Sequence, residues 1–339
     1  MQVSVMGMDI AKQVFQLHGV DEAGGAVVCK RLRRGAVKQF FARLGPTVVG
    51  MEACATSHYW ARELRALGHE VRLIPPRYVK GYVRRNKTDA ADAAALCEAL
   101  RGRGMHLVPV KSEAQQAVLV LHRVRECLVH QRTMTANALR GHLAEFGIVA
   151  ARGQAGLDKL MTGLGAVGLP EEARFALELA ATQWRELDQK IDALERRIVA
   201  WHRGDEMSRR LASIPGIGPI TASALAASIG DPKAFKTGRH FAAWLGLTPR
   251  EWSSGLKRRQ GGISKRGDGY LRRLLILGAH SVMRHHGRAG LPAPDPWLMT
   301  LRARKPAAVA AVALANKTAR IAWAVMAHGE TYHRRRAVA

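Results

Sequence analysis

The 339-residue chain contains few cysteines, and their spacing excludes two common kinds of site. None of the four stands in a Cys-x-x-Cys pair or near histidines at zinc-finger spacing, so neither a zinc site nor a disulfide framework is indicated. We interpret them as buried thiols of a protein in a reducing cytoplasm: Cys29, Cys54, Cys97 and Cys127. A signal-peptide pattern is also lacking, and the longest run of small apolar residues, 307 to 315, is too short to span a bilayer.

Acidic residues are scarce as well. The sequence has 27 Asp and Glu against 53 Lys and Arg, which gives a formal net charge of +26 and a pI of about 11.0. A polyanion is the expected partner. Because the cations are spread over the chain and form no single basic amphipathic helix, nucleic acid is favoured over a membrane surface. We therefore expect a cytoplasmic, nucleoid-associated protein.

Among so few acids, Asp89 and Asp92 stand out. They lie three residues apart at the start of an alanine-rich run, and Thr88 is a good N-cap, so both are expected on one face of a helix. Carboxylate oxygens suit a hard divalent cation, and the neighbouring Lys87 could hold phosphate beside it. The plainer interpretation is a capped surface helix with ordinary first-turn acids.

From residue 3 to about 110 the pattern predicts an α/β domain. Strands are expected at 3–9, 14–20, 26–30, 47–52 and 69–74, and helices at 37–44, 57–67 and after Thr88. Asp9 and Glu52 come at the ends of the first and fourth strands. If these strands are neighbours, four carboxylates converge and require cations, and the natural choice is a Mg²⁺ pair acting on a phosphodiester. For either acid alone, a solubilising charge at a strand end explains its position equally well.

The segment 111–205 is predicted to be a long helical arm. A basic helix is expected over 117–146, followed by a Gly-rich break at 147–170. A 3-4 apolar repeat then runs from Leu177 to Trp201, which is typical of a coiled-coil seam. An antiparallel hairpin within the chain and a dimerising arm both fit this pattern.

The remainder, 206–339, is expected to be mainly helical. Gly216 and Gly218 form a Pro-Gly-x-Gly turn before a helix, which resembles a helix-hairpin-helix module and would present backbone N–H groups to phosphate; an ordinary interhelical turn is the alternative. A glycine-rich basic loop follows and exposes Ser253 and Ser254. Its cations could follow a phosphate backbone: Arg250, Lys257, Arg258, Arg259, Lys265 and Arg266.

Five motifs occur in order along the chain: Gly7-Met8-Asp9-Ile10-Ala11-Lys12, Met51-Glu52-Ala53, Asn86-Lys87-Thr88-Asp89-Ala90-Ala91-Asp92, Ile214-Pro215-Gly216-Ile217-Gly218 and Gly246-Leu247-Thr248-Pro249-Arg250. In these motifs, and over nearly its whole length, the chain resembles the DEDD transposases of the insertion-sequence-110 family, relatives of the Piv invertases. The resemblance implies a RuvC-like RNase H fold over 1–110, a coiled-coil arm over 111–205 and a transposase domain over 206–339.

The resemblance also implies a mechanism. Asp9, Glu52, Asp89 and Asp92 would be the DEDD acids that hold Mg²⁺, and a serine directly before a glycine would link covalently to DNA. That position falls on Ser254, although Ser253 beside it makes the assignment ambiguous. The implied partners are donor and target DNA, a structured guide RNA encoded by the element (a bridge RNA), and further copies of the chain in a dimer or tetramer.

Two other functions fit the residues. In a RuvC-like structure-specific endonuclease, water would attack the phosphodiester and the serine would be a bystander. A non-catalytic nucleic-acid-binding protein would need only the turn, the basic loop and the helical arm. A phosphotransferase is disfavoured because the chain has no Gly-x-x-x-x-Gly-Lys pattern.

Overall fold

The computed structural model describes residues 2–82, 88–102, 107–151, 153–163, 168–254, 257–285 and 295–333. The chain forms two compact units. Unit 1 consists of Met1–Glu113 with Ile229–Ala234, and unit 2 of Ala114–Ser228 with Phe235–Ala339.

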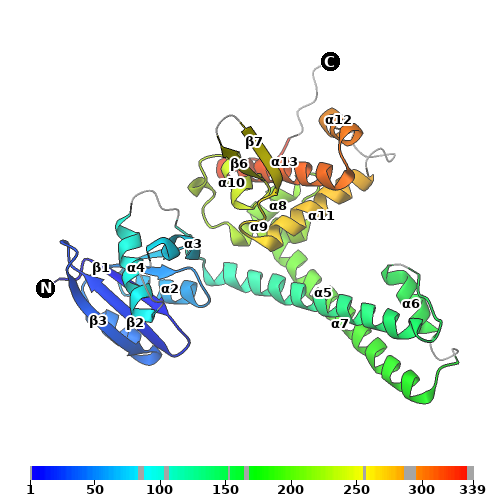
Figure 1. Ribbon diagram of the computed structural model, residues 1–339, viewed down its shortest axis with the longest axis horizontal. Coiled ribbons are helices and arrows are strands. Elements are labelled where there is room, and N and C mark those ends of the chain that lie inside the picture. The colour runs from blue at the N-terminus through cyan, green and yellow to red at the C-terminus, as the bar shows by residue number, and fades with distance from the viewer. Residues whose placement is uncertain are drawn as a thin grey trace. The chain divides into compact units, whose positions relative to one another are not determined.

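Unit 1 is built on a mixed β-sheet. Among its described residues the sheet has five strands in the order β3-β2-β1-β4-β5 (Figure 1). The strands β1 to β3 form an antiparallel meander, whereas β4 and β5 run parallel to β1. The predicted meander is confirmed, and the predicted strands agree with the observed ones to within a few residues: β1 (Val5–Ile10), β2 (Val14–Val20), β3 (Ala26–Arg33), β4 (Val48–Glu52) and β5 (Glu70–Ile74).

Helices cover both faces of this sheet. On one face α1 (Val37–Ala42) and α2 (Ser57–Ala66) pack on Phe15 of β2, whose ring centroid lies 5.0 Å from that of Trp60 in α2. On the other face α4 (Asp89–Arg101) packs across β1, β2 and β4 (Figure 1). Shorter helical segments complete the unit: η1 (Arg34–Ala36), α3 (Pro76–Val79), η2 (Lys80–Tyr82) and η4 (Pro232–Ala234).

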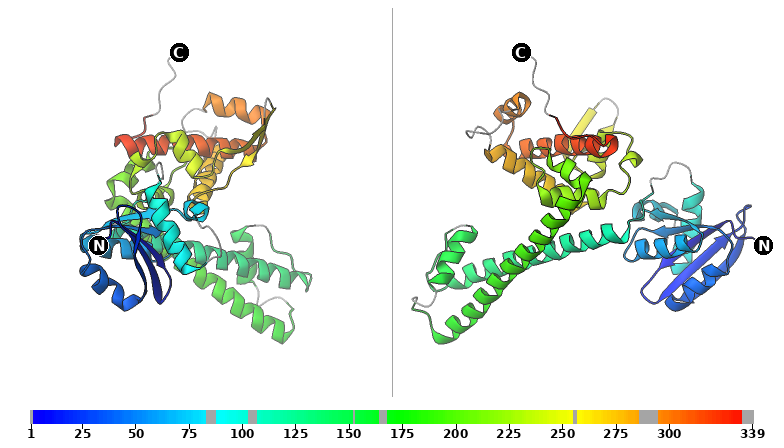
Figure 2. Two further views of the ribbon diagram at one scale, coloured as in Figure 1. Left: turned by 60° about the vertical axis from the view of Figure 1, so that its left-hand side comes forward. Right: turned by 180° about the vertical axis from the view of Figure 1, so that it is seen from behind.

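The long helices of unit 2 form an antiparallel pair, shown from two sides in Figure 2. They are α5 (Glu113–Ala144) and α7 (Glu171–Gly204), held by ion pairs from Arg125 to Glu195 and from Arg132 to Asp188. The apolar repeat predicted for α7 supplies its buried side, from Leu177 to Ile198. The Gly-rich segment between the two helices was expected to be a break, but it contains α6 (Gln154–Thr162), which closes the apolar core at that end of the pair.

The rest of unit 2 is mainly helical with one β-hairpin. Where the sequence suggested a basic loop, the structure has two antiparallel strands. The other elements are helices, as the sequence predicted for most of this segment. In chain order the elements are α8 (Glu206–Ala212), α9 (Pro219–Ser228), α10 (Gly238–Trp244), β6 (Pro249–Ser254), β7 (Lys257–Ile263), α11 (Gly269–His285), α12 (Pro296–Arg304) and α13 (Ala307–His328).

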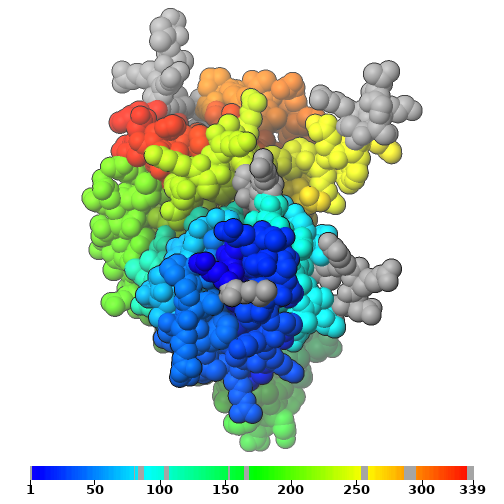
Figure 3. Space-filling model, turned by 90° about the vertical axis from the view of Figure 1, so that its left-hand side faces the viewer, coloured from blue at the N-terminus to red at the C-terminus, as the bar shows by residue number. Residues whose placement is uncertain are grey.

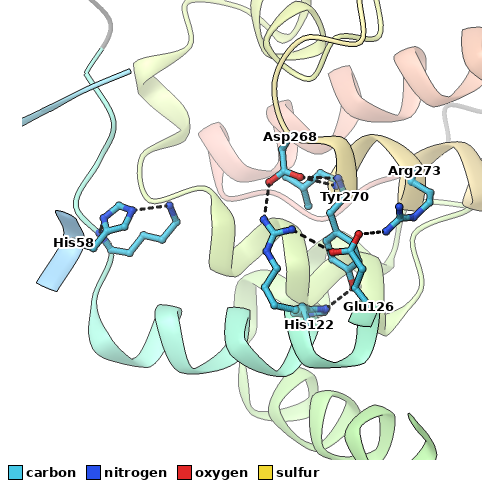
Figure 4. A network of polar contacts seen from close by, with 9 residues as sticks. His58, His122, Glu126, Asp268, Tyr270 and Arg273 are labelled. Carbon is cyan, nitrogen blue, oxygen red and sulfur yellow. Dashed lines mark hydrogen bonds and ion pairs between the residues drawn. The ribbon is translucent and has the colours of Figure 1, made fainter. Parts of the chain in front are cut away.

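A buried histidine ties α5 to this helical body (Figure 4). His122 is 1% exposed; its Nδ1 lies 2.9 Å from the Tyr270 hydroxyl of α11, and its Nε2 lies 3.1 Å from the Ser223 hydroxyl of α9. Burial, assisted by the nearby charges of Arg125 and Arg123, lowers the pKa of His122 to about 4. The ring is therefore neutral at physiological pH and can bond to both hydroxyls.

The apolar helix α13 extends well beyond the predicted run of small residues. Among the described residues it is the one helix whose length and composition would allow it to cross a membrane. Half of its most apolar window is buried, and it packs against α8, α10, α11 and α12. This packing identifies α13 as a core helix of unit 2.

The cysteines correct one expectation from the sequence. Only Cys97 is buried, whereas Cys29, Cys54 and Cys127 are exposed. Cys97 accepts a hydrogen bond from the Gly7 amide at 3.1 Å and donates one to the His18 carbonyl at 2.9 Å. Its burial depends on helix packing that residue type alone does not reveal.

Two glycines of unit 2 provide a matched test of packing. A Cβ added at Gly278 of α11 would lie 1.9 Å from the Gly216 carbonyl oxygen, whereas nothing lies within 4 Å of a Cβ at Gly141 of α5. We expect Gly278→Ala to lower the free energy of unfolding by about 2–3 kcal/mol through steric overlap. Gly141→Ala should raise it by about 0.5–1 kcal/mol because alanine favours helix. Urea denaturation followed by circular dichroism measures both, and equal effects would contradict this packing.

Candidate functional site

Asp9 and Glu52 are brought together by strand pairing. β1 and β4 are parallel neighbours with Met8 opposite Met51, so the residue that follows each methionine stands at the same edge of the sheet. The two acids are Asp9 and Glu52, and both side chains are partly buried. The condition set by the sequence, that the first and fourth strands be neighbours, is confirmed.

Helix α4 brings the other two acids towards this edge. Gly7 has no side chain, and a Cβ there would lie 2.1 Å from the Ala93 carbonyl oxygen, so α4 rests directly on β1. Asp92 and Asp89 lie in the first turn of α4, before Ala93, on the same face of the sheet as Asp9. Thr88 caps the helix as predicted, since its hydroxyl accepts a hydrogen bond from the Ala91 amide at 3.2 Å.

The pKa of Asp9 is consistent with this convergence of acids. Burial, together with the charges of Asp92, Asp89 and Glu52, raises the pKa of Asp9 from its ordinary 3.8 to about 6. Partial desolvation of the sulfur, together with the charges of Glu52 and Asp9, also raises the pKa of the thiol of Cys54, an exposed residue just beyond β4. The acids are thus close enough to repel one another.

Oxygen donors of this kind match the chemistry of a hard divalent cation. Among the described residues, however, no three His, Cys, Asp or Glu side chains are arranged closely enough to hold a metal ion. The negative charges that raise the pKa of Asp9 would favour a cation beside it. The chemistry of the donor set therefore suits a metal such as Mg²⁺, although these side-chain positions do not form a coordination shell.

The hairpin of unit 2 carries several of the predicted nucleic-acid contacts. Arg250 and Arg259 are exposed on β6 and β7, and the Arg250 guanidinium lies 5.6 Å from the ring centroid of the exposed Trp252. Ser254 is the last residue of β6 and pairs with Lys257, and Ser253 pairs with Arg258. For Ser253, Ser254, Lys257 and Arg258 only the backbone is described, and Lys87 lies outside the described residues.

The segment after the hairpin is fixed by backbone contacts. The Ser264 amide donates to the Thr248 carbonyl at 2.8 Å, and the Lys265 amide donates to the Gly246 carbonyl at 3.1 Å. Arg272 of α11 donates to the Arg266 carbonyl at 3.1 Å. The side chains of Lys265 and Arg266 are exposed. Two cations are therefore held by an ordered backbone beside the base of the hairpin.

The predicted Pro-Gly-x-Gly turn connects α8 to α9. Gly216 adopts a left-handed φ of 88°, and it is packed against Gly278 of α11. Gly218 is exposed just before α9 begins at Pro219. The turn thus places its second glycine at a helix N-terminus, where backbone N–H groups favour anions.

Comparison with known proteins identifies the family. The DEDD transposase family of IS110 elements, described as "Transposase", matches residues 6–148, and the "Transposase IS116/IS110/IS902 family" matches residues 208–291. The chain is 50% identical to a "Probable family 20 transposase" of Pseudomonas aeruginosa, over 98% of this chain and 99% of the relative. The chain belongs to the IS110 family of transposases.

Two further relatives of this transposase are named after their elements. It is 40% identical to the "Transposase for insertion sequence element IS1328" of Yersinia enterocolitica, over 97% of this chain and 98% of the relative. It is 39% identical to the "Transposase for insertion sequence element IS1111A" of Coxiella burnetii, over 97% of this chain and 91% of the relative. Membership of this family makes the transposase a DNA-processing enzyme.

Two residues near the candidate sites were missed by reasoning from the sequence. Cys54 follows Glu52 by two positions, and that spacing could have signalled its place beside the acids. Trp252 is 57% exposed on β6, two residues before Ser254, and exposed tryptophan beside arginine is typical of surfaces that stack on bases.

The raised pKa of Asp9 predicts that this aspartate destabilises the metal-free fold in a pH-dependent way. Because its pKa in the folded state, about 6, lies above the ordinary 3.8, the loss of stability is absent below pH 3.8 and complete above pH 6. We expect Asp9→Asn to raise the free energy of unfolding by about 1–2 kcal/mol at pH 8, after allowance for solvent screening, and by little at pH 4.

Urea denaturation in EDTA at the two pH values measures this difference. Glu22→Gln, at an exposed position between β2 and β3, serves as the control and should have the same small effect at both. An Asp9→Asn protein that is destabilised equally at pH 4 and pH 8 would show that the acids do not converge in solution.

Proposed function

We propose that this transposase cleaves and rejoins DNA strands through a covalent serine–DNA intermediate. The observation that carries the proposal is the convergence of Asp9 with Glu52, Asp89 and Asp92 at one edge of the sheet. Clustered like charges lower the stability of a fold, so their presence points to a function. The strand order of unit 1, with three antiparallel strands followed by two parallel ones, supports a RuvC-like RNase H fold.

The four carboxylates would hold Mg²⁺. When bound, the metal would stabilise the charge that develops on the phosphate and on the leaving oxygen. Asp9 and Glu52 are both partly buried, so their charges are screened less than charges at the surface. Helix α4 keeps Asp89 and Asp92 in place through its direct contact with the backbone of β1.

Ser254 would be the nucleophile. Its Oγ forms a bond to phosphorus as the bond from phosphorus to the 3′ oxygen breaks, and the serine proton ends on the released 3′ hydroxyl. A second transesterification, in which a 3′ hydroxyl attacks the phosphoserine, releases Ser254 and rejoins the strand without external energy. Ser254 is the last residue of β6 and pairs with Lys257, the first residue of β7, so the proposed nucleophile stands at the end of the hairpin strands.

The surrounding cations would bind nucleic acid backbone. Arg250, Arg259, Lys265 and Arg266 are exposed around the hairpin, and Lys87, Lys257 and Arg258 add charge in the sequence. The turn of Gly216 and Gly218, similar to that of a helix-hairpin-helix module, would add backbone donors. We infer donor and target DNA as partners, with an element-encoded guide RNA that supplies sequence specificity by base pairing. A homodimer or tetramer, with α5 and α7 as a coiled-coil arm, completes the proposal.

The test is a covalent adduct. The transposase is expressed with its native flanking DNA, so that any element-encoded RNA is present, and is then given labelled junction DNA and Mg²⁺. We expect a protein–DNA adduct that survives denaturant in the wild type and in Ser253→Ala, and that is lost in Ser254→Ala and Asp89→Asn. Denaturing electrophoresis reads the adduct and the cleaved DNA together.

The same gel separates the competing functions. Cleaved DNA without an adduct in any variant would establish a RuvC-like endonuclease that uses water. DNA binding with neither adduct nor cleavage, even with the flanking DNA supplied, would support a non-catalytic binding protein. An adduct lost in Ser253→Ala and kept in Ser254→Ala would move the nucleophile by one residue.

A further inference from the structure

A row of polar residues leads across the sheet from Asp9 to the edge strand β3. Asp9 of β1 pairs with Gln16 of β2, and Gln16 pairs in turn with Arg31 of β3. Residues paired directly across strands lie on the same face of a sheet. Two strand spacings of about 4.8 Å place the Arg31 backbone about 10 Å from that of Asp9. Arg33 is two residues further along β3 and therefore shares this face.

Two neighbouring cations, Lys30 of β3 and Arg34 of η1, lie on the opposite face. The Lys30 ammonium is 5.5 Å from the ring centroid of Phe40 in α1, and the Arg34 guanidinium is 5.3 Å from that of Trp60 in α2. Both therefore lie on the side of the sheet that α1 and α2 cover. The strand thus separates its cations, with Arg31 and Arg33 on the side of the acids and Lys30 on the other.

This part of the acid-bearing face is open among the described residues. Helix α4 packs over β1, β2 and β4, whereas β3 lies beyond it at the edge of the sheet (Figure 1). Arg31, Arg33 and Cys29 are exposed, and the Gln16 amide lies 3.8 Å from the Cys29 sulfur on the same face. In Figure 3 the N-terminal residues, dark blue, lie at the surface of unit 1.

We propose that Gln16, Arg31 and Arg33 form a track for the sugar–phosphate backbone of the DNA strand whose phosphodiester is processed at Asp9. This inference rests on the proposed function of the acids. Guanidinium groups bind phosphate through paired hydrogen bonds, and the Gln16 amide is a further donor. Such contacts carry no sequence information but fix the register of a strand, so the three are positioning residues.

Charge explains why such a track is needed. Four carboxylates repel a polyanion at the place where it must be cut, and cations about 10 Å away can hold the flanking phosphates without neutralising the acids themselves. The alternative is that the charges of β3 merely prevent edge-to-edge pairing of sheets. In that case Arg31, Arg33 and Lys30 would be equivalent, because all three are exposed on the same edge strand.

The first test is the salt dependence of DNA binding. The full-length transposase is titrated with labelled junction DNA in EDTA, which prevents cleavage, over a range of salt concentrations. We expect the double variant Arg31→Gln/Arg33→Gln to lower the slope of log K against log salt by about 1.8, or about 0.9 for each lost phosphate contact. Lys30→Gln is the matched control on the opposite face and should leave the slope unchanged.

The second test uses the exposed thiol on the proposed track. Maleimide labelling of Cys29, followed by mass spectrometry, should slow several-fold when DNA is bound to the wild type and should not slow in the double variant. Equal slopes for the double variant and Lys30→Gln, or Cys29 labelling unaffected by DNA in the wild type, would overturn the track. A slope change seen only with the element-encoded RNA would overturn the assignment to DNA.

These readouts are independent of the serine chemistry. If the wild type forms no adduct with Mg²⁺ but the slope falls as expected, the covalent mechanism fails and the track stands. If the adduct forms and the slope does not change, the reverse holds.

Discussion

The site in unit 1 depends on the direct contact between helix α4 and the sheet. Gly7 of β1 lies beneath the Ala93 carbonyl, and Gly50, which pairs with Gly7, lies beneath Leu100. A side chain at Gly7 would push the backbone of the helix away from the strand, and one at Gly50 would displace the Leu100 side chain. Because Asp89 and Asp92 project from the first turn of α4, the missing side chains beneath it determine how near the two aspartates come to Asp9 and Glu52.

This arrangement concentrates like charge in a partly buried place, which opposes folding. Packing on the two faces of the sheet offsets this repulsion. Phe15, Phe41 and Trp60 pack on the face covered by α1 and α2, and on the face covered by α4 Cys97 is hydrogen-bonded to the backbone of β1 and β2. Catalytic groups are commonly held in place at such a cost to stability. In this transposase the rigid sheet and helix hold the acids, whereas the serine belongs to a hairpin in the other unit.

Much of this could be predicted from the sequence where local patterns decide the structure. The hydrophobic patterns predicted the five strands, Thr88 predicted the start of α4, and the apolar repeat from Leu177 predicted the buried side of α7. The hairpin around Ser254 was missed because neither β6 nor the basic, glycine-containing β7 shows apolar alternation. Helix α6 was missed because the glycines around it suggested a break, although Leu157 and Met161 are buried in the core. The exposure of three cysteines depends on packing between distant segments, which residue type does not encode.

The bond between His122 and Tyr270 joins residues 148 positions apart, and Ser223 is 101 positions from the same ring. During translation, the strands and helices of residues 1 to 113 therefore leave the ribosome long before α5 can find its partners. The surface of α5 that packs against α9 and α11 has no partner on the nascent chain until those two helices have been made. The strands and helices of residues 1 to 113 can fold early, whereas the helical body of unit 2 is complete only after the chain has been made as far as α13, which packs against α11.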